Sequence, residues 1–143
     1  MLFSCEVETT DPEHSLEFEV LIDGESFASA QVRERIEIRS IFNDTSQTET
    51  QHVFEFVLKN KLPEHTKINE QGEIVKDVLL KLHNVKFDTV NIDNLMLEHA
   101  RYHHDFNGTG EPVEQQFSGT MGCNGTVRLN VTYPIYLWLL DHY

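Results

Sequence analysis

The sequence predicts an all-β protein: an antiparallel β-sandwich of jelly-roll or immunoglobulin-like topology that ends in a short helix. Three observations lead to this prediction. Apolar and polar residues alternate along much of the chain, Asp-Gly separates two alternating segments, and no internal segment carries a sustained apolar stripe of helical period. With 143 residues, of which 39% are hydrophobic, the chain is expected to form a single domain over residues 1–143.

The first expected element is a β-hairpin. In residues 16–22 the even positions are apolar and the odd positions are mostly charged, and a second segment, residues 25–30, follows directly after Asp23 and Gly24. Asp-Gly suits a type I′ turn, because both central residues of that turn have positive φ. The two segments are therefore expected to pair across this turn.

Two further strands are expected at residues 35–41 and 52–58, with the even-numbered apolar residues of the second strand facing inward. A polar, Thr-rich loop at residues 43–51 separates them. Residues 60–72 read as a longer connection that contains Pro63 and turn residues and lacks a helical stripe. The connection could hold a helical turn.

The next strand changes parity. Between residues 78 and 87, apolar residues occupy even positions up to residue 82 and odd positions from residue 85. An uninterrupted strand cannot bury both sets, so a bulge or break is expected near His83 and Asn84. Residues 92–98 are expected to form another short strand, and residues 127–131 the last one.

The segment of residues 133–143 differs from the rest because its apolar residues surround the expected helix on every side. Thr132 is expected as the N-cap, and Pro134 suits the first turn. A helix lying on its own domain needs only one apolar stripe, so two roles stay open: docking on a partner, or plugging an open end of the sandwich. Docking is favoured, through Ile135, Tyr136, Leu137, Trp138, Leu139 and Leu140.

The net charge of −13 limits the kinds of partner that the protein is expected to bind. Such a field repels phosphate, which argues against nucleic acid and anionic membranes. No apolar segment reaches the ~18 residues needed to span a bilayer, and the N-terminus turns acidic at once, unlike a signal peptide. The expected location is therefore cytoplasmic, with Cys5 and Cys123 as reduced thiols.

The densest polar cluster covers residues 99–105. Histidines beside a carboxylate can bind zinc or perform acid–base chemistry, although no His-Glu-x-x-His motif accompanies them. A hydrogen-bonded loop is the alternative. If the cluster binds a ligand, its candidate residues are Tyr102, His103, His104 and Asp105. A metal-dependent enzyme would use the whole cluster from His99 to Asp105.

A second cluster could offer oxygen ligands to calcium, but Asp and Asn also cap their own backbone in turns, and turn chemistry is favoured. No cofactor or metal is therefore expected. The Gly-rich residues 118–126 lack the Lys of a phosphate-binding loop, and no Gly-x-Ser-x-Gly elbow occurs, so an enzyme is not expected. The calcium candidates are Asp88, Asn91, Asp93 and Asn94.

Aromatic side chains on a surface would suit carbohydrate binding, since rings stack on sugars, although most aromatic residues of a sandwich lie in its core. The candidates are Tyr102, Phe106, Tyr133 and Trp138.

Two resemblances add to these patterns. The hairpin of residues 16–24 and the later stretch Ile92-Asp93-Asn94-Leu95 resemble jelly-roll carbohydrate-binding modules, which implies a sugar ligand. Residues 104–109 and 119–126, with the ending 134–140, look like small β-sandwich accessory proteins of tailed bacteriophages, on capsids or tails.

The leading hypothesis is a non-enzymatic structural protein of a phage virion, assembled in the host cytoplasm. It would dock on other structural subunits through residues 133–143. The alternative is a carbohydrate-binding module that recognises glycans, and a third hypothesis is a metal-dependent enzyme that uses the cluster at residues 99–105.

Overall fold

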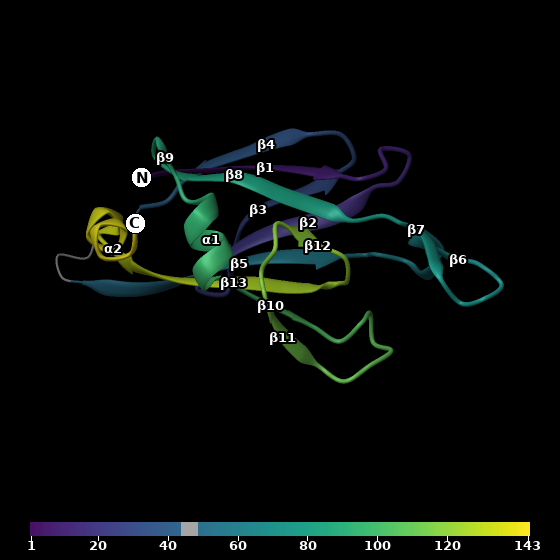
Figure 1. Cartoon of the computed structure of the whole chain (residues 1–143). Coiled ribbons are helices and arrows are strands. Elements are labelled where there is room, and N and C mark those ends of the chain that lie inside the picture. Colours follow the sequence, from purple (N-terminus) through teal and green to yellow (C-terminus); the bar gives the residue numbers. More distant parts are fainter. Residues whose placement is uncertain (44–48) are drawn as a thin grey trace.

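The computed structural model describes residues 1–43 and 49–143. Two antiparallel sheets face each other in the described chain, one with five strands and one with six, and a two-stranded sheet projects from one end (Figure 1). This arrangement confirms the predicted all-β sandwich with a short C-terminal helix. The central part of the loop predicted at residues 43–51 lies outside the described residues.

The five-stranded sheet has β1 (Leu2–Thr9) and β8 (Leu80–Phe87) at its centre, and all of its pairings are antiparallel. Residues 36–41 pair with β1 and form one edge of the sheet, as the alternation at residues 35–41 predicts. In spatial order the strands are β12 (Thr120–Met121), β8 (Leu80–Phe87), β1 (Leu2–Thr9) and β4 (Ile36–Ile41), and the short β9 (Val90–Asn91) also pairs with β8.

The six-stranded sheet is held together by a long central pair, in which residues 125–133 run antiparallel to residues 50–58. This pair joins the hairpin of the N-terminal half to the hairpin that carries the histidines. In spatial order the strands are β11 (Val113–Gln116), β10 (Arg101–His104), β13 (Gly125–Tyr133), β5 (Thr50–Lys59), β2 (Leu16–Ile22) and β3 (Glu25–Val32).

Phenylalanine rings from both sheets form the centre of the core. The ring of Phe3 on β1 lies 5.6 Å from Phe54, 6.0 Å from Phe56 and 6.1 Å from Phe87, measured between centroids. All four side chains are buried. The inward direction predicted for the even-numbered residues of 52–58 is therefore confirmed, and burial of large rings is a principal source of the stability of such a core.

The predicted hairpin is confirmed. β2 and β3 pair from Leu16 and Val32 up to Ile22 and Glu25, with Asp23 and Gly24 as the two-residue turn. Their φ angles are 53° and 84°, as a type I′ turn requires.

The predicted interruption of β8 is also confirmed. Glu6 pairs with His83 and Ser4 with Lys86, so Asn84 and Val85 together oppose a single residue of β1. Asn84 has a φ of 49°. This bulge turns the residues beyond it to the other parity, which allows the apolar residues on both sides of it to face the core.

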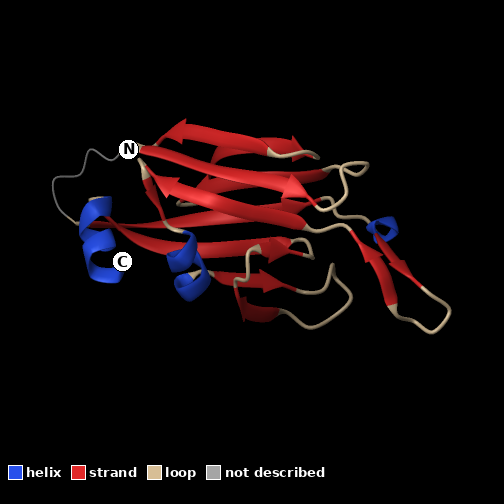
Figure 2. Ribbon diagram, turned by 45° about the horizontal axis from the view of Figure 1, so that its top comes forward, coloured by secondary structure: helices blue, strands red, loops and turns tan. Residues whose placement is uncertain are grey.

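The strand predicted at residues 92–98 is wrong, because this segment forms helix α1 (Asp93–His99). Its buried residues are Leu95 and Met96, and Ile92 and Ala100 at its two ends are also buried. That spacing is helical, whereas Leu97, which suggested a strand, is 39% exposed. The helix lies against β8 beside the bulge. Figure 2 shows the helices and the sheets from a second angle.

The connection predicted at residues 60–72 contains the helical turn that the sequence allowed, and also a strand that the sequence did not indicate. It holds a short 3₁₀ turn, η1 (Pro63–His65), followed by β6 (Thr66–Ile68), which pairs with β7 (Ile74–Asp77). This hairpin projects beyond the sandwich (Figure 1), at the end opposite α2 (Ile135–His142). The sequence lacked a clear signal because the exposed Ile68, Ile74 and Val75 do not alternate with polar residues.

The C-terminal helix begins after Pro134, which occupies the N-cap position. The predicted N-cap, Thr132, lies instead within β13 and pairs with Gln51. No helix among the described residues is long and apolar enough to cross a membrane.

Both cysteines are free thiols. Cys5 lies in the core, and burial raises its pKa to about 12. Cys123 is half-buried, and burial raises its pKa too. Neither thiol is poised as a nucleophile, because the thiolate is the reactive form.

Candidate functional site

An open groove of about 630 Å³ lies at the end of the β10–β11 hairpin, where it meets the start of β13. Three of the four candidate ligand-binding residues line it, so the structure brings most of the predicted cluster together. The lining residues are His103, His104, Asp105, Pro112, Val113, Glu114, Asn124 and Gly125.

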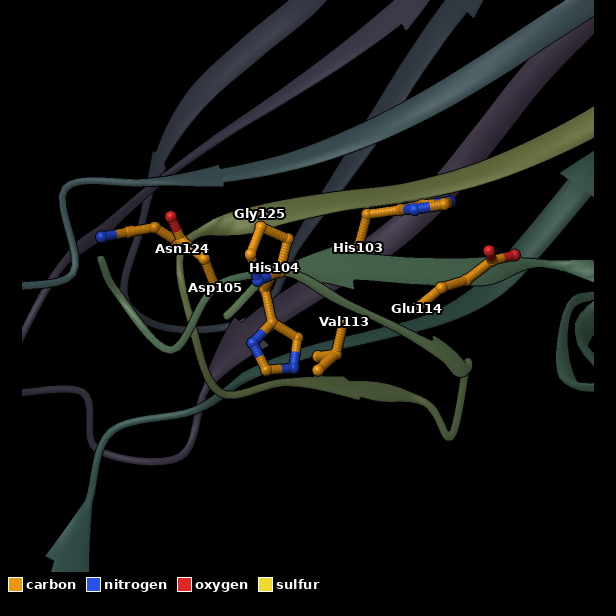
Figure 3. Close-up of a pocket in the computed structure, with 8 residues that line it drawn as sticks. His103, His104, Asp105, Val113, Glu114, Asn124 and Gly125 are labelled. Atoms are coloured by element: carbon orange, nitrogen blue, oxygen red, sulfur yellow. The ribbon is translucent and has the colours of Figure 1, made fainter. Parts of the chain in front are cut away.

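Strand alternation divides these residues between two faces. His103 is paired with Glu114, and His104 with Val113. Opposite residues of an antiparallel pair point to the same side, so the two pairs lie on opposite faces of the hairpin. Figure 3 shows His103 and Glu114 extending together along the hairpin, with the ring of His104 beside Val113.

The side chains of His103 and Glu114 form no hydrogen bond or ion pair with the described part of the chain. Glu114 is exposed and His103 is half-buried. The outer side of the groove therefore offers a carboxylate and an imidazole whose hydrogen-bonding groups are available to a ligand. Sequence reasoning missed Glu114, because only the pairing of β10 with β11 brings it opposite His103.

His104, by contrast, is fixed by its own protein. Its Nδ1 accepts the backbone N–H of Phe106 at 3.2 Å, which leaves Nε2 to donate to Oε1 of Gln115 at 3.1 Å. Its ring lies 4.6 Å from Tyr102 and 4.8 Å from Phe106. His104 therefore links the hairpin to the turn that follows it, and both of its ring nitrogens already have a hydrogen-bond partner in the protein.

Tyr102 is the one predicted ligand residue that does not reach the groove. Its side chain is 6% exposed, and its hydroxyl donates to the carbonyl of Cys123 and accepts the N–H of Cys123 at 2.9 Å. Burial raises the pKa of its hydroxyl. The expectation that Tyr102 contacts a ligand is corrected: strand alternation turns it inward, where it holds the turn that precedes β13.

Asp105 shapes the loop beyond β10. Its Oδ1 accepts the N–H of Gly108 at 2.8 Å, and its carbonyl accepts the N–H of Gly110 at 3.0 Å. Its Oδ2 has no hydrogen-bond partner among the described residues. One carboxylate oxygen thus organises the loop, while the other remains available at the end of the groove.

Lys61, which the sequence analysis did not identify, fixes the side chain of Asn124, which lines the groove. Its backbone N–H donates to Oδ1 of Asn124 at 2.8 Å, and its carbonyl accepts from Nδ2 of Asn124 at 3.0 Å. Its ammonium, on a side chain that is 1% exposed, donates to Asp77 at 2.6 Å and to the carbonyl of Gly122. A buried cation needs such partners. Lys61 thus connects Asn124 of the groove with Asp77 at the end of β7.

Gly125 is required where β13 passes β10. A Cβ built on it would lie 2.3 Å from the carbonyl oxygen of His103 and 2.8 Å from the Cβ of His104. No larger residue fits without moving backbone, which explains glycine at this position of the groove.

His99 does not line the groove with His103 and His104. It lies at the end of α1, and its ring is 5.1 Å from that of His142 on α2. Among the described residues, no group of three or more His, Cys, Asp or Glu side chains is placed to hold a metal ion.

Of the four candidate calcium ligands, Asp88, Asn91 and Asp93 accept backbone N–H groups. The two oxygens of Asp93 accept the N–H groups of Asn84 and Val85, both at 2.9 Å, and Asp88 accepts the N–H of Leu2 at 2.8 Å. Asp93 thus stabilises the bulge of β8 from the first turn of α1. These bonds fit the turn chemistry that the sequence favoured over calcium.

The predicted docking segment is divided by the structure. Trp138 is 4% exposed and packs edge to face on Phe87 at 6.3 Å, and Ile135 is also buried. Tyr136 and Leu140 are 61% and 79% exposed. The expectation that all six residues are free for a partner is corrected: one face of α2 belongs to the domain's own core, and only the outer face is open.

The carbohydrate-stacking candidates are likewise mostly unavailable. Tyr102 and Trp138 are buried, and Tyr133 packs on Phe42 at 5.8 Å. Only Phe106 is open, with 44% exposure.

No protein-family model matches the sequence, and no curated protein matches it. A solved structure described as "vCBM60 in complex with galactobiose" aligns with 92% of this chain and 100% of its own, with a TM-score of 0.47 and 9% identity. A likeness at that level shows neither a function nor a binding site for this chain.

Proposed function

We propose that this protein is a non-catalytic binding module whose ligand is a neutral carbohydrate, held in the groove at the β10–β11 hairpin. One observation supports this most: His103 and Glu114 lie opposite each other on one face, and their side chains make no hydrogen bond or ion pair with the described part of the chain. Asp105 adds a free carboxylate oxygen at the end of the same groove.

The chemistry of these groups suits sugar hydroxyls. A carboxylate accepts two hydrogen bonds from neighbouring hydroxyls, and a neutral imidazole donates one and accepts one. Pro112 lines the same groove and adds apolar surface, which sugar rings require beside their polar contacts. The net charge of −13 disfavours phosphorylated or carboxylated ligands, which leaves neutral sugars as the best match.

Binding without chemistry fits the openness of the groove. General acid–base catalysis depends on groups that are held at the reacting atoms and shielded from water. Here Glu114 is exposed, and His104 is tied to Phe106 and Gln115.

The proposal is tested by screening neutral oligosaccharides on an array and measuring the affinity of the hits by calorimetry. Glu114→Gln and His103→Ala should each weaken binding at least about tenfold, because each removes a direct hydrogen bond. Glu111→Gln is the matched control, since it removes the same charge three positions away from Glu114 and outside the lining. If no neutral glycan binds, or if Glu114→Gln binds as tightly as the control, the proposal fails.

A second candidate function is attachment to a larger assembly such as a phage virion, with other structural subunits as partners. The outer face of α2 favours it, because Tyr136, Leu140 and Tyr143 are 61%, 79% and 74% exposed. Large aromatic residues are common anchors of protein interfaces. Tyr136→Ser with Leu140→Ser should abolish co-sedimentation with particles without unfolding the domain, and retained co-sedimentation would eliminate this candidate.

A further inference from the structure

β4 forms one edge of the five-stranded sheet. Within the described chain it pairs only with β1, from Ile36 opposite Val7 to Ile41 opposite Leu2. It lies at the outer limit of its layer in Figure 1. An edge strand presents backbone N–H and C=O groups that can pair with another strand.

The side chains of β4 alternate between core and solvent. Ile38 is 8% exposed and faces the core, whereas Glu37 and Arg39 on either side of it face outward. Their charges are opposite, and Nε of Arg39 lies 3.1 Å from Oε1 of Glu37. Both side chains remain about half exposed, at 49% and 61%, so they can reach a further partner.

We propose that two copies of this chain associate through β4, antiparallel about a two-fold axis, so that their sheets join into one. With Ile38 opposite Ile38 of the second copy, Glu37 lies opposite Arg39 of that copy, and Arg39 lies opposite its Glu37. Directly opposite side chains of an antiparallel pair are ~5 Å apart at Cβ, and opposite charges there stabilise the pairing.

The same charges select this register. A shift of two residues in one direction places Arg39 opposite Arg39 of the second copy, and the opposite shift places Glu37 opposite Glu37. Like charges directly opposite each other are destabilising, so the symmetric register is the favoured one.

The end of the strand supports the same register. Ile41 is 65% exposed, and this register places it opposite Arg35 of the second copy. The aliphatic stem of an arginine can cover an apolar side chain while its charge stays in water. The pairing would therefore cover an isoleucine that the single copy leaves open.

The edges of the six-stranded sheet lack this symmetry. β3 has a register shift opposite Val20 and Leu21, which disrupts its ladder. β11 carries Glu114 with no cation, so no self-pairing of that strand places opposite charges across from each other. β4 combines a regular ladder on its inner side with charges that complement a second copy of themselves.

The overall charge of −13 does not prevent this association at physiological salt. The Debye length is then about 8 Å, so the distant acidic groups of two copies are largely screened, while directly opposite side chains are not. The inference is independent of the ligand groove, which lies in the other sheet.

The test is sedimentation analysis of four proteins: the natural chain, Glu37→Arg, Arg39→Glu, and the variant with both changes. The natural chain should be dimeric. Each single variant should dimerise at least about tenfold more weakly, because it places like charges opposite each other twice across the two-fold axis. The double variant restores opposite charges and should dimerise like the natural chain.

An equimolar mixture of the two single variants is the sharpest measurement. One variant presents two arginines and the other two glutamates, so together they should form a heterodimer although neither forms a strong homodimer. Formation of the heterodimer also shows that both variants are folded. The proposal is overturned if the natural chain stays monomeric up to millimolar concentration, if the single variants dimerise as well as the natural chain, or if the mixture remains monomeric.

Discussion

Replacing Trp138 with alanine should lower the free energy of unfolding by about 3–5 kcal/mol, the usual loss for a large buried aromatic residue. The indole is 4% exposed, edge to face with Phe87 at 6.3 Å and stacked on His142 at 4.9 Å. Phe87 belongs to β8 rather than to α2, so collapse into the vacated space would require the helix to move. The free energy of unfolding of a single domain is about 5–15 kcal/mol in total, so the Trp138→Ala variant should be only marginally stable.

Tyr136→Ala is the matched control, because it removes an aromatic ring two positions away that is 61% exposed. It should change the free energy of unfolding by less than about 0.5 kcal/mol. Unfolding should be followed by far-UV circular dichroism in urea, since Trp138 is the only tryptophan and its fluorescence disappears with it. In thermal scans the midpoint temperature of Trp138→Ala should be lower by about 6–20 °C than that of the natural chain. An unchanged midpoint, or an equal loss for Tyr136→Ala, would refute the placement of Trp138 in the core.

Two further predictions follow from single positions. Gly125→Ala should lower the free energy of unfolding, measured in urea, by about 1–3 kcal/mol, because its Cβ would lie 2.3 Å from the carbonyl oxygen of His103. Gly122→Ala is the control and should lower it less, because its Cβ would meet only a methyl group of Leu79 at 3.2 Å. Equal losses for the two variants would contradict this reasoning. His65 accepts the N–H of Leu62 on Nδ1 at 2.9 Å, and burial lowers its pKa below the ordinary 6.5. As the pH falls, the unfolded chain therefore protonates His65 at a higher pH than the folded chain does. Above about pH 6.5 His65 should not affect the free energy of unfolding, and below that pH the free energy of unfolding should fall. His65→Gln should remove this component of the pH dependence, and a natural chain equally stable at pH 7 and about pH 5 would count against it.

The strand pattern could be predicted wherever local chemistry and long-range packing agree. Asp23 and Gly24 adopt positive φ in the turn because that conformation suits Asp and Gly in any context. The bulge at Asn84 could be predicted as well, since two sets of apolar residues of opposite parity must both reach the core.

Helix α1 could not be predicted in this way. Its few apolar residues fit both a strand and a helix, and a short segment gives too few repeats to separate a period of 2 from one of 3.6. The choice is settled by the surroundings: the carboxylate of Asp93 accepts two N–H groups of the bulge, and Leu95 and Met96 are buried.

The candidate site could be predicted only in part. The histidines of β10 were visible as a cluster, but the register of β10 with β11 brings Glu114 opposite His103, and register between distant strands leaves no local signal. The same holds for Lys61, which reaches Asn124 across 63 positions of the chain.

By itself, the sequence determined the all-β class, the first hairpin and the terminal helix, because each depends on residues close together in the chain. The tertiary structure decided which side of each element is used. In α2 it turned Ile135 and Trp138 into the core and left Tyr136 and Leu140 outside, although all four are apolar. The physical reason is that hydrophobic burial has no direction of its own: an all-round apolar helix fits any orientation, and only the ring of Phe87 and its neighbours select one.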